Sequence, residues 1–293
     1  YDVVEKGYWA RMGDRYVKGT NIDIEYTPGS KMLFPRMWDN RDDAYIDVYR
    51  SYIGNKGKKV AGCSEPKPTF LQNLLFFFDY QINWMYWRYF MWNFAGRQNE
   101  IHSPSPGDIF KGNWECGIGF IDRIRLGDQS DAPAYLAQNK GKNHYYMLPL
   151  LLGIIGAVFQ YSRDRRGCWL NFLMFFMTGL AIVIYLNQSP LQVRERDYAY
   201  AGSFYFFSAW IGSGCLACIE KALQSVREEK YRRWIAVSGV LICLGIPALM
   251  AAENWDDHDR SGRYTCRDYG ANYLKTIPAN GIIFTNGDND TFP

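Results

Sequence analysis

The sequence lacks the short motifs that identify several large enzyme classes. It has no phosphate-binding loop, no G-x-G-x-x-G dinucleotide fingerprint and no serine-hydrolase elbow. It also has no basic tail or arginine-rich stripe, and the formal net charge is only +3, so we expect no nucleic-acid partner. The seven cysteines form neither a disulfide framework nor a zinc pattern. The placement of apolar residues is therefore the main source of information.

Four segments of the chain contain no Asp, Glu, Lys, Arg or His. They are residues 145–161, 168–186, 203–219 and 234–252. About 20 helical residues cross the hydrocarbon core of a bilayer, and each segment approaches that length. Glycines and serines recur within them, as is typical of membrane helices that pack closely. The sequence therefore predicts a mainly α, polytopic membrane protein with a four-span bundle over residues 144–252. Buried helices of a large soluble domain are the alternative.

The charges of the connecting loops predict an orientation. The loops at 162–167 and 220–233 carry an excess of Lys and Arg, which marks the cytoplasmic side. The loop between the second and third spans would then lie on the opposite side, together with residues 1–143 and 253–293. We therefore expect a multi-pass protein of the inner (cytoplasmic) membrane, surrounded by membrane lipids, with large extracytoplasmic parts.

The polar parts of the chain divide into three regions. Residues 1–69 are rich in Gly, Asp, Tyr and Lys and predict an extracytoplasmic loop region, and residues 97–143 predict a second one. Residues 253–293 predict the start of an extracytoplasmic domain, of α or α/β structure. In that domain a helix precedes a buried strand at 282–285.

Between the two loop regions, 12 of the 25 residues from 70 to 94 are aromatic. Asp79, Gln81, Asn83 and Arg88 interrupt the aromatic residues. A lipid-bathed span tolerates such residues badly, whereas Trp and Tyr favour the headgroup zone. We therefore interpret residues 70–96 as an aromatic helix that lies at the outer interface or against the bundle. A fifth crossing, which would place residues 1–69 inside, is the alternative.

The stretch RERDYAY, residues 194–200, places four adjacent charges in a short connection between two apolar segments. Guanidinium groups form bidentate hydrogen bonds with phosphates, so Arg194 and Arg196 are candidates for binding a lipid phosphate. The residues that would support them are Glu195, Asp197, Tyr198 and Tyr200. The alternative is an internal salt-bridge cluster that stiffens the start of a helix.

Two further acidic clusters provide secondary candidates. They are His258, Asp259 and Arg260 after the last apolar segment, and Asp288 and Asp290 in NGDNDTFP. His258 and Arg260 could face the same pocket as Arg194. The D-x-D pattern at 288–290 can hold a divalent ion, but a turn with side chain–backbone hydrogen bonds is the default. Consecutive acidic residues point in different directions, so we predict no metal site. A metal hydrolase built on residues 256–259 remains a third alternative.

Long strings within residues 70–293 carry a family resemblance. They are YWRYFMWNFAGRQNE, GNWECGIGF, FFMTGLAIVIYLNQSPLQVRERDYAYAGSFY, WDDHDRSGRYTCRDYGANYL and IIFTNGDNDTFP. These strings resemble a family of large bacterial membrane proteins, common in Bacteroidota, that is classed with protein O-mannosyltransferases. The resemblance implies part of a GT-C-type helical bundle. It also implies a glycosyltransferase that moves a sugar, mannose by this analogy, from a polyprenyl-phosphate donor to Ser or Thr of exported proteins on the outer face.

The resemblance does not extend to a catalytic residue. The family's first outer loop holds an acidic motif expected to supply the catalytic carboxylate, and nothing in this sequence matches it. We therefore leave the catalytic residue unassigned and expect the sequence to be a fragment that is inactive alone. No cofactor is implied beyond the lipid-linked sugar, which is a substrate.

The resemblance and the loop charges together assign a role to RERD. The leaving group of such a transfer is a lipid phosphate whose growing negative charge must be stabilised. We predict that Arg194 and Arg196 bind this phosphate and that Glu195 and Asp197 hold the two arginines in place. The alternative is a non-catalytic membrane scaffold or lipid-handling subunit in which these charges fix helix ends.

Overall fold

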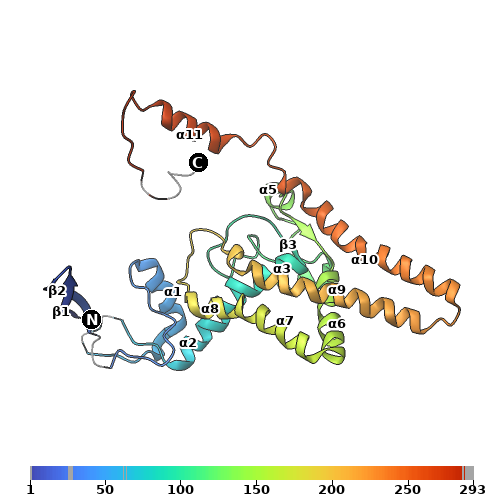
Figure 1. Ribbon diagram of the computed structural model, residues 1–293, viewed down its shortest axis with the longest axis horizontal. Coiled ribbons are helices and arrows are strands. Elements are labelled where there is room, and N and C mark those ends of the chain that lie inside the picture. Colours follow the sequence, from blue (N-terminus) through green and yellow to red (C-terminus); the bar gives the residue numbers. More distant parts are fainter. Residues whose placement is uncertain (1, 26–28, 62, 64, 286, 288–293) are drawn as a thin grey trace.

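The computed structural model describes residues 2–25, 29–61, 63, 65–285 and 287. The chain is mainly helical, with 56% of its residues in helices, which confirms the predicted class. A helical bundle occupies one side of Figure 1, and the N-terminal hairpin and the C-terminal helix α11 extend away from it. The pocket described below lies where the bundle meets the loops of residues 97–143.

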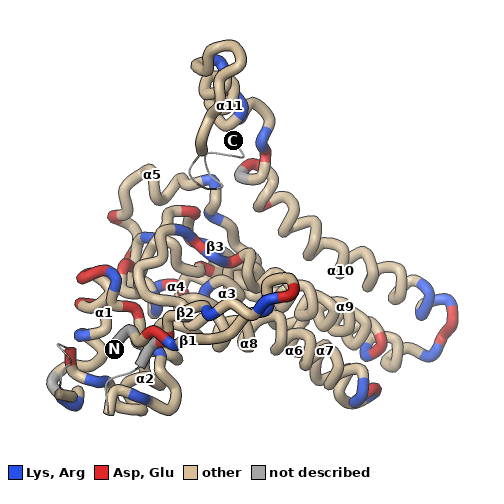
Figure 2. Tube along the Cα trace, turned by 60° about the vertical axis from the view of Figure 1, so that its left-hand side comes forward, with Lys and Arg blue, Asp and Glu red and all other residues tan. Residues whose placement is uncertain are grey.

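The bundle contains the helices α6 (Leu148–Arg163), α7 (Arg165–Met177), α8 (Leu180–Leu186), α9 (Ala201–Gln224) and α10 (Glu229–His258). Three stretches are long and apolar enough to cross a membrane: Arg165–Leu186, Asp197–Gln224 and Glu229–Asp256. We therefore treat the chain as a membrane protein. Figure 2 shows Lys, Arg, Asp and Glu gathered in the connection between α9 and α10 and sparse along the helices themselves.

These candidate spans cover three of the four predicted ones. The first predicted span forms α6, an apolar helix of 16 residues that is shorter than the other three. It starts late because Met147 has a left-handed backbone (φ 60°) and Pro149 follows at the beginning of the helix. It ends at Arg163 because the Asp164 side chain accepts a hydrogen bond from the Gly167 N–H and caps α7 instead.

Small residues allow α6 and α9 to cross in close contact. A Cβ atom added at Gly156 would lie 1.7 Å from the carbonyl oxygen of Trp210. A Cβ at Gly214 would lie 2.0 Å from the carbonyl oxygen of Leu152. The backbones therefore approach in a way that only glycine permits, as is common between membrane helices. At the far end of this pair, Arg163 of α6 forms an ion pair with Glu220 of α9.

The second predicted span is interrupted at Thr178–Gly179, which separates α7 from α8. A Cβ at Gly179 would lie 2.5 Å from Oγ of Ser203 and 2.9 Å from the Tyr86 ring. The Tyr86 hydroxyl and Ser203 Oγ are 2.7 Å apart and share a hydrogen bond. The break therefore lies where another helix, which carries Tyr86, packs against the bundle.

The helix that carries Tyr86 is the aromatic segment. It is continuous from Phe70 to Phe94 and consists of α2 (Phe70–Phe76), the π-helix η2 (Phe77–Trp87) and α3 (Arg88–Phe94). Thr69 and Gln72 form a reciprocal capping box at its start. Most of its rings are buried, including those of Tyr80 and Tyr89 at 0% exposure. The helix therefore packs against the bundle, and its rings form the centre of the core.

Three of the four polar residues that interrupt this helix have partners, and the fourth, Asn83, is exposed. Gln81, at 1% exposure, donates through Nε2 to the Gln188 carbonyl oxygen (2.9 Å) and to the Asn187 side chain. Arg88, at 2% exposure, pairs with Glu195. Asp79 faces outward and accepts a hydrogen bond from the Tyr52 hydroxyl (2.6 Å). Other segments of this chain, and not lipid, therefore surround its buried polar face.

The region at 1–69, predicted as loop, contains two strands and a helix. Strands β1 (Asp2–Met12) and β2 (Arg15–Glu25) pair antiparallel with Asp2 opposite Glu25, forming an isolated hairpin. Helix α1 (Asp43–Ile53), capped by Asp42, and the 3-10 turn η1 (Gly54–Lys56) follow. Sequence alternation misses the hairpin because both of its faces are solvated, so apolar residues such as Trp9 and Ile22 stay exposed.

Residues 97–143 are mostly irregular, with the short helices α4 (Gly119–Leu126) and α5 (Ala134–Ala137). Strands β3 (Gly96–Arg97) and β4 (Asn143–His144) pair across this region. After α10 the chain forms α11 (Thr265–Lys275), as predicted. The predicted strand at 282–285 is wrong: these residues are irregular and Phe284 is 90% exposed, because no strand in the described part of the chain pairs with them.

Candidate functional site

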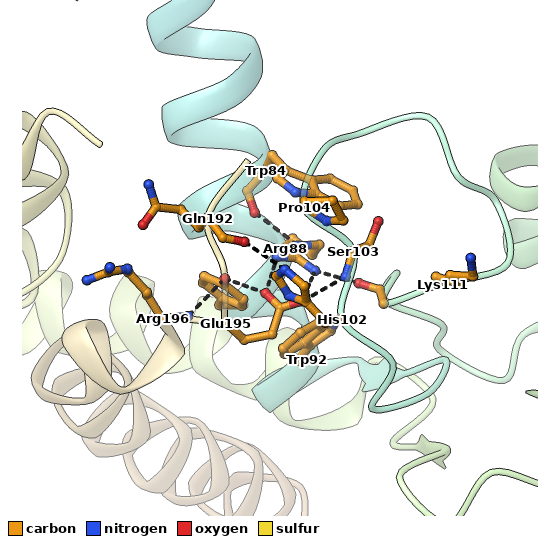
Figure 3. Close-up of polar contacts among 12 residues, drawn as sticks. Trp84, Arg88, Trp92, His102, Ser103, Pro104, Lys111, Gln192, Glu195 and Arg196 are labelled. Atoms are coloured by element: carbon orange, nitrogen blue, oxygen red, sulfur yellow. Dashed lines mark hydrogen bonds and ion pairs between the residues drawn. The ribbon is translucent and has the colours of Figure 1, made fainter. Parts of the chain in front are cut away.

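Glu195 is the centre of a half-buried hydrogen-bond cluster. Its Oε2 lies 2.6 Å from Nη2 of Arg88 and accepts a 2.6 Å hydrogen bond from the Tyr89 hydroxyl. Its Oε1 accepts from the Ser103 N–H at 3.2 Å and lies 3.2 Å from Nδ1 of His102. Figure 3 shows Arg88 of the aromatic helix and His102 and Ser103 of the loop after it converging on the carboxylate. Glu195 therefore joins the connection before α9 to the aromatic helix and to the loop that follows this helix.

The protonation of Glu195 follows from this cluster. Burial raises the pKa of the carboxyl group, but the hydrogen bonds and charge of Arg88, with the hydrogen bonds from Tyr89 and Ser103, outweigh that effect. The pKa of Glu195 consequently lies below its ordinary value. Glu195 is an ionised structural anchor, which corrects the prediction that it holds the neighbouring arginines.

The guanidinium groups of Arg194 and Arg196 are separate from the Glu195 cluster. Arg194 is exposed, with its guanidinium 5.9 Å from the ring centre of Tyr198. Arg196 donates its backbone N–H to the Tyr89 hydroxyl (3.1 Å), while its side chain points away from Glu195 in Figure 3. Its Nε is buried and has no hydrogen-bond partner among the described residues. Neither guanidinium forms an ion pair with a carboxylate in the described part of the chain.

The two tyrosines of the stretch differ in environment. Tyr198 is 58% exposed, whereas Tyr200 is fully buried and packs edge-on against Tyr86 at 5.3 Å between ring centres. Tyr200 therefore belongs to the core. Only Tyr198 presents its ring to the surroundings.

Hydrogen bonds also hold the start of the connection between α8 and α9. The Trp38 indole N–H donates to the Asn187 carbonyl oxygen (2.8 Å). Arg36, which is 6% exposed, donates to the Ile184 carbonyl oxygen (3.0 Å) at the end of α8. A buried cation at a helix C-terminus complements the helix dipole. The connection from α8 to α9 is thus fixed at both ends, and Asp197 follows directly as the first residue of the turn η3 (Asp197–Tyr200).

A polar pocket of about 670 Å³ opens beside Asp197, between the start of α9 and the end of α10. Its walls are formed by Trp92, Asn93, Arg97, Asn143, Tyr145, Asp197, Met250, Ala251, Asn254, Trp255, His258 and Asp259. The structure thus brings together three of the predicted residues: Asp197, His258 and Asp259. Arg194, Arg196 and Arg260 do not line this pocket, and Asp288 and Asp290 lie outside the described residues.

Arg97 is the cation in this pocket, and the sequence did not single it out. Its guanidinium carbon lies 4.1 Å from the ring centre of Trp92. Burial lowers the pKa of Arg97, and the negative charges of Asp197 and Glu195 partly offset that effect. Its Nε is buried without a hydrogen-bond partner, and no carboxylate among the described residues lies within ion-pair distance. Arg97 therefore lines the pocket, and its Nε has no hydrogen-bond partner among the described residues.

Local backbone geometry places Arg97. Gly96 has φ +135°, and a Cβ at this position would lie 2.4 Å from the carbonyl oxygens of both Asn143 and Glu115. Glycine is required for β3 to pass this close to β4. The Arg97 N–H then donates to Oδ1 of Asn143 at 2.8 Å. The only local sequence signal for the site is this Gly-Arg pair at the end of the aromatic helix.

The end of α10 closes the pocket by docking on β4. Asn254 accepts a hydrogen bond from Nδ2 of Asn143 (3.0 Å) and donates to the Tyr145 hydroxyl (2.6 Å). Glu253 accepts from the His144 N–H (3.1 Å). Nδ1 of His258 lies 3.0 Å from the Asn254 carbonyl oxygen. Within the described residues, no three His, Cys, Asp or Glu side chains are grouped so as to hold a metal ion.

Fold and pocket together define a helical membrane protein with a polar pocket at the ends of its spans. Residues 2–78 match a family of unknown function (DUF8416), and residues 266–293 match TMEM260-associated domain 2. The two matches lie at either end of the sequence, and the pocket residues fall between them. No curated protein and no solved structure matches the chain.

Proposed function

We propose that the chain is part of a membrane glycosyltransferase that moves a sugar from a polyprenyl-phosphate donor to Ser or Thr of exported proteins at the outer face of the inner membrane. The sugar is mannose by the family resemblance of its sequence. The observation that carries the proposal is the pocket in which Arg97 and Asp197 meet at the ends of the apolar helices. The catalytic base is left unassigned.

Arg97 has the properties required of a ligand for the donor phosphate. Its guanidinium is permanently charged, partly withdrawn from solvent, held over Trp92 and unpaired in the described part of the chain. When the sugar departs, negative charge grows on the lipid phosphate, and a fixed cation stabilises that charge. Arg97 thus takes the role that the sequence assigned to Arg194 and Arg196.

The other walls of the pocket suit a sugar. The rings of Trp92, Trp255 and Tyr145 offer apolar faces, on which the C–H faces of a hexose can pack. The side chains of Asn93 and Asp197 offer hydrogen-bond donors and acceptors for hydroxyl groups. A pocket of about 670 Å³ with a few convergent polar groups is within the usual range for small-molecule sites.

Arg194 and Arg196 keep a supporting role in this proposal. Both precede Asp197 directly in the connection that leads into the pocket. A cation near a binding site, such as the exposed Arg194 or the partly exposed Arg196, raises the local concentration of an anionic ligand and increases its rate of association. Their contribution is therefore to the rate of donor capture, and it weakens as salt is added.

The test is sugar transfer to a Ser/Thr peptide by the full-length protein in its own membranes. Wild type is compared with the Arg97→Ala, Arg97→Lys and Arg194→Ala variants at matched expression. We expect Arg97→Ala to lose at least about 100-fold in transfer, since one charge-stabilising donor contributes 10²–10³ in rate. Arg194→Ala should keep most of its activity. Absence of transfer by wild type with every donor tried would favour a non-catalytic lipid-handling subunit.

A further inference from the structure

The hairpin of β1 and β2 extends away from the helical bundle (Figure 1). Each of its strands has 11 residues, and within the described residues β1 pairs only with β2. The outer edge of β1 therefore presents a row of backbone N–H and C=O groups without a neighbouring strand. A two-stranded hairpin is only marginally stable by itself in water, so a further strand at this edge would stabilise it.

Large apolar side chains are exposed along β1. Trp9 is 67% exposed and Met12 is 70% exposed. The Tyr8 ring leans toward β2 and lies across Gly19, where an added Cβ would be 2.9 Å from the ring. The ring therefore does not cover the outer edge at the centre of the strand. A long free edge with exposed apolar side chains is a template for pairing with another strand.

The sequence of β1 is complementary to itself when two copies run antiparallel with Tyr8 at the centre. Opposed residues then lie equally far from Tyr8 in opposite directions along the strand, on the same face of the sheet. Glu5 lies opposite Arg11 of the second copy, and twofold symmetry produces this pair twice. Trp9 lies opposite Gly7, so its indole ring can pack over a glycine as the Tyr8 ring does over Gly19.

The two charged residues of this register are available for pairing. Glu5 is exposed and forms no ion pair with another described residue. The ion pair of Arg11 with Asp14 spans 3.8 Å between side chains that are both largely exposed, so it is weak. A shift of two residues, the smallest that keeps each side chain on its face, separates Glu5 from Arg11. One antiparallel register is therefore favoured over its neighbours.

We propose that two copies of the chain associate through the outer edges of their β1 strands and form a four-stranded antiparallel sheet around a twofold axis at Tyr8. The partner is a second copy, because the charges of Glu5 and Arg11 are opposite in sign and equally spaced about Tyr8, as an isologous contact requires. The inference concerns assembly and does not depend on the proposed sugar transfer.

The first experiment measures association of the full-length protein in liposomes, by energy transfer between copies with donor and acceptor labels. Arg11→Glu and Glu5→Arg each place like charges opposite one another twice, so each variant alone should associate at least about tenfold more weakly than wild type. Arg15→Glu reverses an exposed charge on β2, away from the contact, and should associate like wild type.

An equal mixture of Arg11→Glu and Glu5→Arg restores opposite charges at both positions and should associate like wild type. A hairpin that had failed to fold would not recover on mixing. The mixture therefore separates pairing between copies from loss of structure.

The second experiment locates the contact by oxidative cross-linking, after the exposed residues Cys63, Cys218 and Cys266 have been replaced by serine. Tyr8→Cys should form a disulfide between copies, since opposed Cα atoms of an antiparallel pair are about 4.5–5.5 Å apart. Thr20→Cys on β2 should not, because two strands would separate its two copies.

Wild type that stays monomeric at every protein-to-lipid ratio would overturn the inference. So would wild-type association of Arg11→Glu and Glu5→Arg, or a mixture of the two that does not recover. A disulfide through Thr20→Cys in place of Tyr8→Cys would put the contact at β2 and would equally contradict the assignment of the β1 edge.

Discussion

The carboxylate of Glu195 lies 2.6 Å from the guanidinium of Arg88, a residue 107 positions earlier in the chain. Both side chains are largely withdrawn from solvent, at 15% and 3% exposure. The pair joins the connection before α9 to the helix at the centre of the core. It thereby fixes the backbone from which Asp197 reaches the polar pocket.

Removing one partner of this pair should destabilise the fold. Glu195→Gln leaves the Arg88 charge buried and uncompensated, which costs about 3 kcal/mol or more. Denaturation of the purified protein with SDS, followed by circular dichroism, measures the change. The exposed pair Arg50–Glu65 provides the control, and Glu65→Gln should cost less than about 1 kcal/mol. Equal losses in the two variants would show that Glu195 is not an anchor.

The same pair should make stability depend on pH. The pKa of Glu195 is lowered in the folded protein, so its stabilising contribution is present above the ordinary value of about 4.3. That contribution is lost as the pH falls from there through the folded-state pKa. We expect the difference in stability between wild type and Glu195→Gln to be constant near neutral pH and to shrink in acid. A difference that grows on acidification would contradict the assignment.

The contact between α6 and α9 should not tolerate a side chain at Gly156. A methyl group there would overlap the backbone of Trp210, so Gly156→Ala should cost about 1–3 kcal/mol through forced separation of the helices. Gly245→Ala, with nothing within 4 Å, is the matched control and should change stability little. Thermal unfolding in detergent measures both. Wild-type stability of Gly156→Ala would show that the helices do not cross here.

The sequence was sufficient to predict the helices for a local reason. Residues 168–186, 203–219 and 234–252 are each free of charge over nearly a full span, and that pattern predicts apolar helix, although the first of these segments is interrupted at Thr178–Gly179. The short α6 could not be foreseen, because its ends depend on the backbone of Met147 and on the cap formed by Asp164. The hairpin of β1 and β2 was not predicted because neither of its faces is consistently apolar.

The site was predicted less completely because its residues meet through long-range pairing. Asp197, His258 and Asp259 were identified from their position beside apolar segments, and all three line the pocket. Arg97 reaches the same pocket only because its backbone pairs with Asn143, 46 positions later. Similarly, charge pattern assigned Glu195 to its neighbours Arg194 and Arg196, whereas its true partner approaches from a distant helix. The adjacent charged residues Arg194, Glu195 and Asp197 therefore lie in three different environments: at the surface, in the buried cluster and at the pocket.

The most direct measurement of the central claim is the affinity of the full-length protein, in nanodiscs, for a polyprenyl-phosphate sugar. It compares wild type with Arg97→Ala and Arg97→Lys. Loss of a charge-assisted contact in a partly buried site corresponds to about 1.5–3 kcal/mol, so we expect Arg97→Ala to bind at least about tenfold more weakly. Arg97→Lys should recover part of the loss, since it restores the charge without the planar fork. Wild-type affinity in a folded Arg97→Ala protein would contradict the assignment of this pocket to the donor phosphate.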